Sequence, residues 1–239
     1  ATMVEGAAAI PYHVPNFHCS AHIINNPVTT LWWRSVGHTH TGYAVETFID
    51  ELLEKAGKDP AEGRLALMTD PKHARLAGAL RKAAAMAGGM NAPHGRARGV
   101  AAVESFGSFV AQVAEVSMEN GLPRVHKVWC AVDCGVAVNP EVIKAQMEGG
   151  IGYGLGAILF NELTLDDGGS VTQSNFHDYR SLRIGEMPEV EVEIIVSNEA
   201  PTGVGEPGVP PIGPAVANAV RRLTGKTPRR LPMIKELQA

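Results

Sequence analysis

Three strand-like runs in the middle of the chain constrain the fold more than any other feature. They read ARGVAAVES, FVAQVAEVSM and RVHKVWCAVD, and the turn ENGLP joins the last two. A later run, PEVEVEIIVSN, alternates strongly between apolar and acidic residues and predicts a further strand. The chain therefore has to contain β-sheet.

Two helices are predicted before the three central strands in the sequence. Residues 42–57 (GYAVETFIDELLEKAG) place apolar side chains at helical spacing, and Gly57 ends this helix. Residues 70–89 form an amphipathic pattern with Asp70 as the N-cap and Gly88 at the C-terminal end. Helix, strand and loop signals thus alternate along the chain.

Two more helices are predicted after the strands. One starts at Asn139-Pro140 and runs to about residue 163, and the other covers residues 213–225 and ends at Gly225. DDGG reads as a turn, and HCSAHII near the N-terminus reads as a short β-like piece. The mixture predicts an α+β fold, with a subdomain boundary near residue 95 that divides the chain into residues 1–95 and 96–239.

Composition excludes several classes of protein. The chain has 239 residues, 45% of them hydrophobic, which is enough to bury a core. Its formal charge is −4 and no basic run is interleaved with aromatics, so nucleic acid is not expected as a partner. No apolar run reaches the roughly 18 residues of a membrane span. The opening ATMVEGAAAI lacks an initiator Met, which leads us to expect a processed product or a fragment.

The cysteines are predicted to be free thiols. Cys130 and Cys134 lie in one strand-like run, where four residues span about 13 Å and place the sulfurs beyond disulfide reach. The pair His38 and His40 and the group HCSAH suggest zinc, but neither has the ligand spacing that makes such a site specific. No zinc site is therefore assigned.

The helix after Asn139 carries five glycines: Gly149, Gly150, Gly152, Gly154 and Gly156. Each interior glycine costs about 1 kcal/mol relative to Ala, so the run needs a reason. Gly149, Gly152 and Gly156 fall on one face, where another backbone or a flat ligand could approach. Tight helix packing is the alternative explanation. Gln146, just before the glycines, could supply directed hydrogen bonds or be solvated.

Glu206 is the most suggestive single residue. It is the only ionisable residue between Ala200 and Val220, in a segment rich in glycine and proline. Apolar surroundings disfavour a charged carboxylate and suit it to accept a proton at neutral pH. The prolines fix φ and would stiffen the loop. A solvated Glu in a surface turn is the alternative.

Arg34 stands beside two tryptophans in LWWRSVGHTH. An Arg in that position can stack on an indole ring and still donate hydrogen bonds to a phosphate, a carboxylate or a ring carbonyl. Covering apolar surface is the other reading of this side chain.

Taken together, three stretches resemble the molybdenum-binding large subunit of the xanthine oxidase family of molybdenum hydroxylases. They begin at WWRSVGHTHTGYAVETF, at VHKVWCAVDCGVAVNPEVIKAQMEGGIGYGLGAILFNE and at PTGVGEPGVPPIGPAVANAV. The branch they are most similar to is the isoquinoline 1-oxidoreductase and bacterial aldehyde dehydrogenase type. The resemblance implies the C-terminal portion of a molybdopterin-binding domain, with mixed sheets and packed helices.

The resemblance also implies roles for individual residues. Glu206, in Gly205-Glu206-Pro207, matches the active-site glutamate, and Gln146 matches a residue that contacts the pterin. Arg34 and Gly37 match a loop over the metal site, and Gly205 is expected to contact the cofactor. In that loop Ser35, His38, Thr39 and His40 replace several residues of the family pattern R-G-F-G-G-P-Q, so of its individual contacts only that of Arg34 is carried over.

The implied activity is hydroxylation of an aldehyde or an N-heterocycle with water as the oxygen source and Glu206 as the base. The implied cofactor is molybdenum with molybdopterin in its cytosine dinucleotide form. Family members have an upstream portion with G-Q-G and G-F-G-G motifs that this chain lacks. We therefore expect the other part of the subunit as a partner. A non-catalytic subunit-docking module and a zinc hydrolase are the alternatives.

Electrons would leave through iron–sulfur clusters on another subunit, since the chain has three cysteines and no four-cysteine motif. The resemblance adds a flavin or cytochrome subunit as a possible further partner. It places the protein in a bacterium and leaves periplasm and cytoplasm open, with the periplasm favoured.

Overall fold

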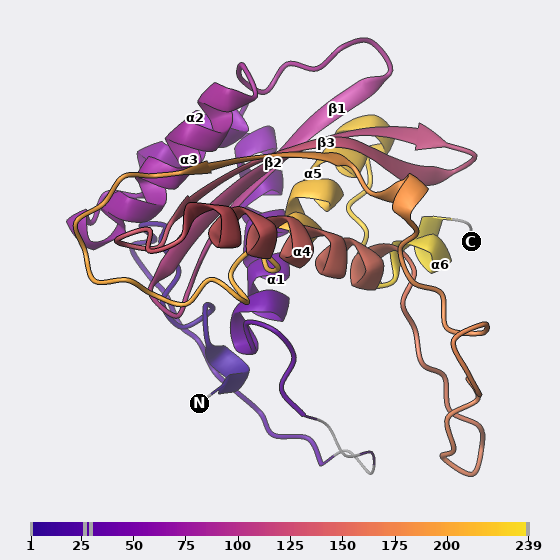
Figure 1. Ribbon diagram of the computed structural model, residues 1–239. Helices are drawn as coiled ribbons and strands as arrows, with labels where there is room; N and C mark the ends of the chain where they lie inside the picture. Colours follow the sequence, from indigo (N-terminus) through magenta and orange to yellow (C-terminus); the bar gives the residue numbers. More distant parts are fainter. Residues whose placement is uncertain (1, 26–27, 29–30, 238–239) are drawn as a thin grey trace.

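The computed structural model describes residues 2–25, 28 and 31–237. It contains a four-stranded sheet packed between helices (Figure 1). In chain order the elements are η1 (Thr2–Val4), α1 (Gly37–Lys55), α2 (Pro60–Leu67), η2 (Pro71–His73), α3 (Ala74–Met86), β1 (Arg96–Ser105), β2 (Ser108–Glu119), β3 (Leu122–Asp133), α4 (Pro140–Leu159), η3 (Ile184–Glu186), β4 (Glu189–Ile194), α5 (Ile212–Thr224) and α6 (Met233–Leu237).

Strands β1, β2 and β3 form an antiparallel meander, and β4 lies parallel to β3. The β2–β3 hairpin turns through Asn120 and Gly121, whose φ angles are 52° and 79°. Asn-Gly is the preferred pair for a two-residue turn with both φ angles positive, and such turns match the twist of the strands. The three central strands are confirmed, and their bounds differ from the predicted ones by at most two residues.

Helix α4 makes the crossover between the parallel strands β3 and β4. It begins as the sequence predicts, because the side chain of Asn139 accepts a hydrogen bond from the amide of Val142 at 3.2 Å and Pro140 occupies the first turn. It ends at Leu159, four residues before the predicted end. The amides of Phe160 and Asn161 both donate to the carbonyl of Gly156, which closes the helix there.

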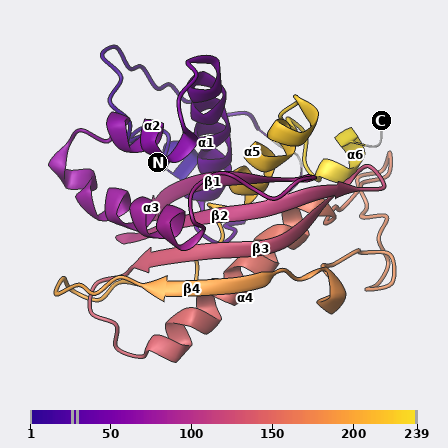
Figure 2. The same cartoon turned by 90° about the horizontal axis from the view of Figure 1, so that it is seen from above.

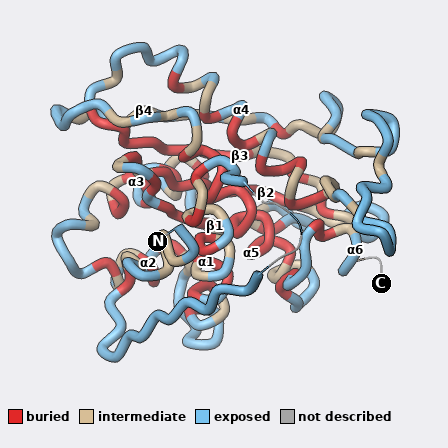
Figure 3. The backbone as a smooth tube through the Cα atoms, turned by 90° about the horizontal axis from the view of Figure 1, so that it is seen from below, coloured by how far each residue is buried: buried red, intermediate tan, exposed pale blue. Residues whose placement is uncertain are grey.

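The sheet has a core on each face. Ala111 and Val113 of β2 face α1, α2 and α3, whereas Val110 and Ala114 face α4 and α5. Figure 2 shows α3 and α4 lying along the sheet and α1 and α5 beside β1. Figure 3 shows the buried segments gathered along the strands and the exposed loops at the periphery. The two-sided packing confirms the α+β class.

The structure also brings the two predicted subdomains together on this one sheet. Helices from residues 1–95 cover one face of a sheet formed by residues 96–239. The boundary near residue 95 falls just before β1 and stays a prediction.

Two predictions near the N-terminus differ from the structure. Residues 18–24 were expected to form a β-like piece, which is wrong: they are exposed and lie outside any strand. The helix expected from residue 42 starts at Gly37, because the side chain of Glu5 accepts a hydrogen bond from the Gly37 amide at 3.1 Å. A carboxylate at that end stabilises the helix dipole.

Helix α2 escaped the sequence analysis, although Asp59 and Pro60 are a typical helix start. The helix predicted over residues 70–89 is confirmed as η2 followed by α3, with Asp70 accepting from the amide of Lys72 at 3.0 Å. Helix α5 ends at Gly225 with a φ of 76°, as predicted.

The three cysteines are free, with Cys19 exposed and Cys130 and Cys134 buried. None of the helices in the part of the chain that the structure describes is long and apolar enough to cross a membrane.

Candidate functional site

The loop that carries Glu206 is fixed on both sides of that residue. Upstream, the hydroxyl of Ser108 donates to the carbonyl of Gly203 at 2.7 Å, and the amide of Thr202 donates to the carbonyl of Cys134 at 2.9 Å. Downstream, the amide of Val209 donates to the carbonyl of Glu206 at 3.0 Å and forms a tight turn. The loop then enters α5. Its backbone is therefore held by the strands rather than left as a free surface turn.

The carboxylate of Glu206 is half-buried and is held by a backbone amide. The amide of Ser35 donates to its Oε1 atom at 3.1 Å. Within residues 2–25, 28 and 31–237, no Lys or Arg forms an ion pair with Glu206, and no hydrogen bond reaches its Oε2 atom. One oxygen is thus positioned and the other is available to a ligand or a proton.

The turn that provides this amide is strained. Ser35 and Val36 have φ angles of 61° and 47°, and a β-branched residue such as Val rarely adopts that conformation. Ser35 is fully buried, and its hydroxyl accepts a hydrogen bond from the hydroxyl of Ser105 at 3.0 Å. Such strain persists only where the surroundings enforce it, and it concentrates at binding and catalytic sites.

Arg34 lies next to this turn and is exposed. Its guanidinium sits over the ring of Tyr153 at 4.6 Å, and Trp33 stacks on the same ring at 4.9 Å. Arg34 was predicted to be able to stack on an indole; in the structure its guanidinium packs on the ring of Tyr153, which α4 presents to both Arg34 and Trp33. The contact holds the cation in place while leaving its hydrogen-bond donors free for a ligand.

Gln146 belongs to the same site. It is half-buried on α4, and a Cβ placed on Gly205 would lie 3.8 Å from its Oε1 atom. The structure therefore brings Gln146 and Gly205 beside Glu206.

Gly37 is covered by the N-terminal segment. A Cβ at that position would lie 2.0 Å from the carbonyl oxygen of Thr2, and its amide donates to Glu5. These contacts require glycine at this position for packing. Its role in cofactor binding stays a prediction.

Four of the glycines of α4 lie close to neighbouring segments. Gly150 and Gly154 face the loop after Glu206, since a Cβ on Gly150 would lie 3.2 Å from the carbonyl carbon of Gly208 and one on Gly154 would lie 2.5 Å from Ile212. Backbone approach therefore occurs at these two positions and not along the predicted row of Gly149, Gly152 and Gly156. In that row Gly152 meets the sulfur of Met187, and Gly156 meets Asn161.

Open backbone beside Gln146 fits a flat polar cofactor. Among the described residues, a Cβ on Gly149 or on Gly203 would meet no atom within 4 Å, and one on Gly205 would meet only Gln146. Glycines with open space let a ligand approach the main chain closely. The described part of the chain contains no group of three His, Cys, Asp or Glu side chains that could hold a metal ion.

The residues after Glu206 also border an apolar pocket of about 310 Å³. Trp33 and Tyr43 line one part of it, and Val209 and Pro210 line another. The surface next to Arg34 is therefore suited to a nonpolar ring.

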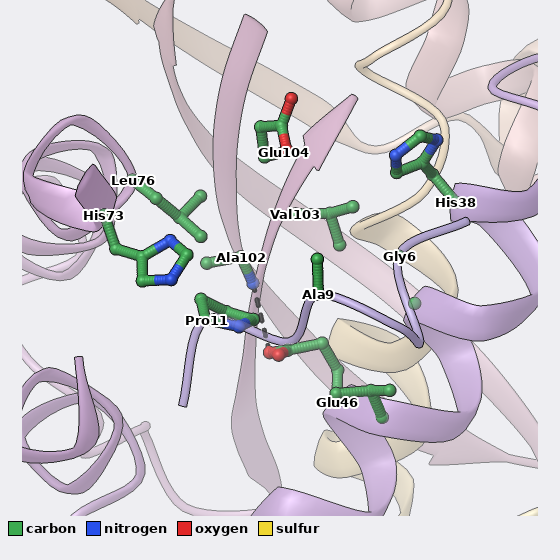
Figure 4. A pocket seen from close by; sticks show the side chains of 12 residues that line it. Gly6, Ala9, Pro11, His38, Glu46, His73, Leu76, Ala102, Val103 and Glu104 are labelled. Atoms are coloured by element: carbon green, nitrogen blue, oxygen red, sulfur yellow. Dashed lines mark hydrogen bonds between the residues drawn. The ribbon is translucent and has the colours of Figure 1, made fainter. Parts of the chain in front are cut away.

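A second buried carboxylate, Glu46, lies elsewhere and is fully bonded. It accepts from the hydroxyl of Tyr12 at 2.5 Å, from Nε of Arg64 at 2.9 Å and from the amide of Ala102 at 3.1 Å. It borders a cavity of about 70 Å³ together with His38 and His73 (Figure 4). Because every oxygen of Glu46 has a donor, we assign this cluster to the stability of the fold.

Three contributors to the site were missed by the sequence analysis: the Ser35 amide, Tyr153 and the buried Gln112 of β2. A backbone amide has no signature in a sequence. Tyr153 stands among the glycines of α4, where a large exposed ring is itself a signal. Gln112 falls between Val110 and Ala114 on the buried face of a strand, and a polar residue there could have been noticed.

Known proteins resemble this chain in sequence. Residues 35–188 match the family described as the molybdopterin cofactor-binding domain. The chain is 36% identical over 234 residues to the isoquinoline 1-oxidoreductase subunit beta of Brevundimonas diminuta, which covers 94% of this chain and 29% of that protein. It is 34% identical over 223 residues to a membrane-bound aldehyde dehydrogenase of Gluconacetobacter polyoxogenes, named as a pyrroloquinoline-quinone enzyme, over 84% of this chain and 29% of that protein.

The fold is also found in a solved structure. The aldehyde oxidoreductase of Desulfovibrio desulfuricans superposes with a TM-score of 0.68 at 15% identity, over 87% of this chain and 41% of that one. At that identity the likeness concerns the fold alone. The chain spans less than a third of the length of the two curated relatives.

Proposed function

Since this chain belongs to the family of molybdopterin cofactor-binding domains, we propose that it is the part of a molybdenum hydroxylase that provides the catalytic base, Glu206. The assignment to this family rests on a match over residues 35–188. The reaction is the hydroxylation of an aldehyde or an N-heterocycle with oxygen from water. The whole enzyme is larger than this chain.

The hydrogen bond from the Ser35 amide to Glu206 carries this proposal. It orients a carboxylate that lacks a cationic partner among the described residues, beside open glycine backbone and the amide of Gln146. A positioned acid with one unpaired oxygen at a half-buried site is suited to take up a proton.

Gln146 and the backbone at Gly149 and Gly205 would hold the pterin, which we propose is the cytosine dinucleotide form. When bound, the cofactor supplies two-electron redox chemistry and a Lewis acid. Gly37 is retained as a candidate contact through the loop that follows Arg34.

Glu206 would accept, at its free Oε2 atom, the proton released as the water-derived oxygen adds to the substrate carbon. The Ser35 amide keeps Oε1 fixed, so little reorganisation is needed before the proton moves. Arg34, held over Tyr153, would orient a carbonyl or a ring nitrogen of the substrate. The neighbouring apolar pocket favours an uncharged ring or chain. The relatives' names, isoquinoline 1-oxidoreductase and aldehyde dehydrogenase, support both substrate classes.

Partners complete the proposal. The remaining part of the molybdenum-binding subunit would close the cofactor site, and an iron–sulfur subunit would take up electrons. A flavin or cytochrome subunit would follow in the electron path. A periplasmic location in a bacterium is part of the same proposal.

Replacing Glu206 by Gln tests the catalytic assignment. The side chain keeps its shape and can still accept from Ser35, but it no longer takes a proton, so kcat should fall by about 10²-fold to 10⁴-fold. Molybdenum content, measured by elemental analysis, should stay near that of the wild type. Glu199→Gln, in an exposed acid upstream of the same loop, is the matched control and should keep full activity.

Near-normal turnover of Glu206→Gln would refute the base assignment. Elemental analysis also separates the enzyme from its alternatives. A complex without molybdenum would support a subunit-docking module, a zinc signal would indicate a hydrolase, and pyrroloquinoline quinone in the extracted cofactor would indicate the chemistry named for the second relative.

A further inference from the structure

Gln112 is a buried amide in the middle of the sheet. It lies on β2 with no exposed surface, on the face that carries Val110 and Ala114 into the apolar core. Placing an amide there is unfavourable unless it is hydrogen-bonded. Its Oε1 atom is buried and has no hydrogen-bond partner among the described residues, so the side chain is retained at a cost to stability.

The single strong bond of this amide goes to the loop that carries Glu206. Nε2 of Gln112 donates to the carbonyl of Gly208 at 2.8 Å, while the sulfur of Cys130 is 3.8 Å away. Gly208 follows Glu206 by two residues and lies within the turn that the Val209 amide closes on the Glu206 carbonyl. Gln112 therefore fixes the backbone immediately next to Glu206.

Helix α4 holds the same glycine from another side. A Cβ on Gly208 would lie 3.2 Å from the Cα of Met147 and 3.3 Å from its carbonyl oxygen. The helix backbone limits how far the loop can move, and the Gln112 bond fixes its carbonyl direction. The amide thus specifies one arrangement of a tightly packed segment.

Ser108 provides the second anchor on the same strand face. It precedes Gln112 by four residues, so the two side chains point to one side of the sheet. Ser108 bonds Gly203, upstream of Glu206, and Gln112 bonds Gly208, downstream of it. Strand β2 therefore holds the loop through hydrogen bonds to a residue before Glu206 and to a residue after it.

We propose that Gln112 is a positioning residue for Glu206: its bond to Gly208 sets the turn that places the carboxylate against the Ser35 amide. The inference rests on the proposed function of Glu206 and assigns Gln112 no contact with substrate or cofactor. Small displacements of a catalytic group lower kcat steeply, by about a hundredfold for 1 Å.

Gln112→Met in the assembled holoenzyme tests this role, because Met has a similar length and no donor. Asn218→Leu is the matched control. Asn218 is also a fully buried amide with an unpartnered oxygen, but it donates to the carbonyl of Val100 at 3.1 Å and does not contact the Glu206 loop. Both variants are expected to lower the melting temperature.

Two measurements separate positioning from a merely structural role. In Gln112→Met the amide of Val209, which closes the turn on the Glu206 carbonyl, should lose at least about tenfold of its hydrogen-exchange protection. The value of kcat per bound molybdenum should fall by about tenfold to a hundredfold with KM unchanged. In Asn218→Leu both quantities should stay at wild-type values. If Gln112→Met does not assemble, Gln112→Asn replaces it, since that amide is one methylene too short to reach Gly208.

Equal exchange and equal kcat in the two variants would overturn the proposal. The exchange comparison is independent of turnover. If Glu206→Gln were fully active, the proposed function would fail, whereas a selective loss of protection in Gln112→Met would still show that Gln112 holds the loop.

Discussion

Glu46 and Glu206 are both carboxylates enclosed by the fold, but they differ in exposure and in the hydrogen bonds that they accept. Glu46 is 1% exposed and receives donors from a tyrosine, an arginine and a backbone amide. Glu206 is half-buried and, among the residues that the structure describes, receives one donor, the Ser35 amide. Both oxygens of Glu46 thus accept hydrogen bonds, so this acid is saturated, whereas Oε2 of Glu206 accepts none from the described residues.

The difference separates a structural acid from a reactive one. Buried polar groups are normally satisfied by hydrogen bonds, and the cluster around Glu46 follows that rule with an ion pair to Arg64. Glu206 departs from it at a site with strained backbone at Ser35 and open backbone at Gly205. Incomplete satisfaction where a ligand can enter is typical of functional sites.

The same substitution at both acids should therefore give opposite results. Glu46→Gln removes one of the two carboxylates that pair with Arg64 in the core. It should cost about 3 kcal/mol of unfolding free energy, the lower end for a broken buried pair, because Asp50 remains at 2.8 Å and the amide oxygen can still accept. Glu206→Gln should change stability by less than about 0.5 kcal/mol. Urea unfolding measures both values.

Activity should show the reverse order. Glu46→Gln should keep its kcat at temperatures where it is folded, whereas Glu206→Gln should lose it. A stability loss at Glu206 as large as that at Glu46 would break the distinction between the two acids.

A second comparison concerns two glycines of α4. Gly154→Ala would bring a Cβ within 2.5 Å of buried Ile212 and should cost about 1–3 kcal/mol through overpacking. Gly149→Ala meets no atom within 4 Å and should gain up to about 1 kcal/mol in helix propensity. Thermal unfolding of cofactor-free protein measures both changes.

The cofactor content of Gly149→Ala provides a second test. If the open backbone at Gly149 borders the pterin, Gly149→Ala should lower cofactor content even as it stabilises the free protein. Unchanged cofactor loading would contradict the placement of the ligand beside Gly149 and Gln146.

Much of the fold was predictable because its signals are local. Strand-like runs marked β1, β2 and β3, Asn139 and Pro140 marked the start of α4, and Gly225 marked the end of α5. The start of α1 was not predictable, because Glu5 caps it from 32 residues away. Contacts of that range are set by tertiary packing and leave no local pattern.

The candidate site was likewise predictable only in part. Glu206, Gln146 and Arg34 could be named from composition and from the family resemblance, and the structure places them together. The bond that joins Glu206 to Ser35 spans 171 residues and uses a backbone amide, so no sequence pattern records it. Helical spacing gave the faces of α4 but not the neighbour of each face: backbone contacts occur at Gly150 and Gly154, and a flat ligand beside Gly149 stays a prediction.

A further prediction concerns Tyr12, which donates to Glu46. Burial, with the nearby Glu46 charge as the second cause, raises the pKa of Tyr12 well above 10. A raised pKa contributes stability that is full below the unfolded value, about 10, and is lost as pH rises toward the folded value. Above pH 10 the wild type should lose up to about 1.4 kcal/mol per pH unit from this group, because only the unfolded chain releases its proton.

Tyr12→Phe removes that dependence. At neutral pH the variant should be less stable by about 1–3 kcal/mol, since Glu46 loses a donor. Between pH 9 and 11 the difference between wild type and variant should shrink, as measured by urea unfolding at each pH. Tyr43, whose pKa burial also raises, is present in both proteins and cancels. A constant difference across this range would mean that Tyr12 is not buried against Glu46, and that the saturated acid is less enclosed than its contacts indicate.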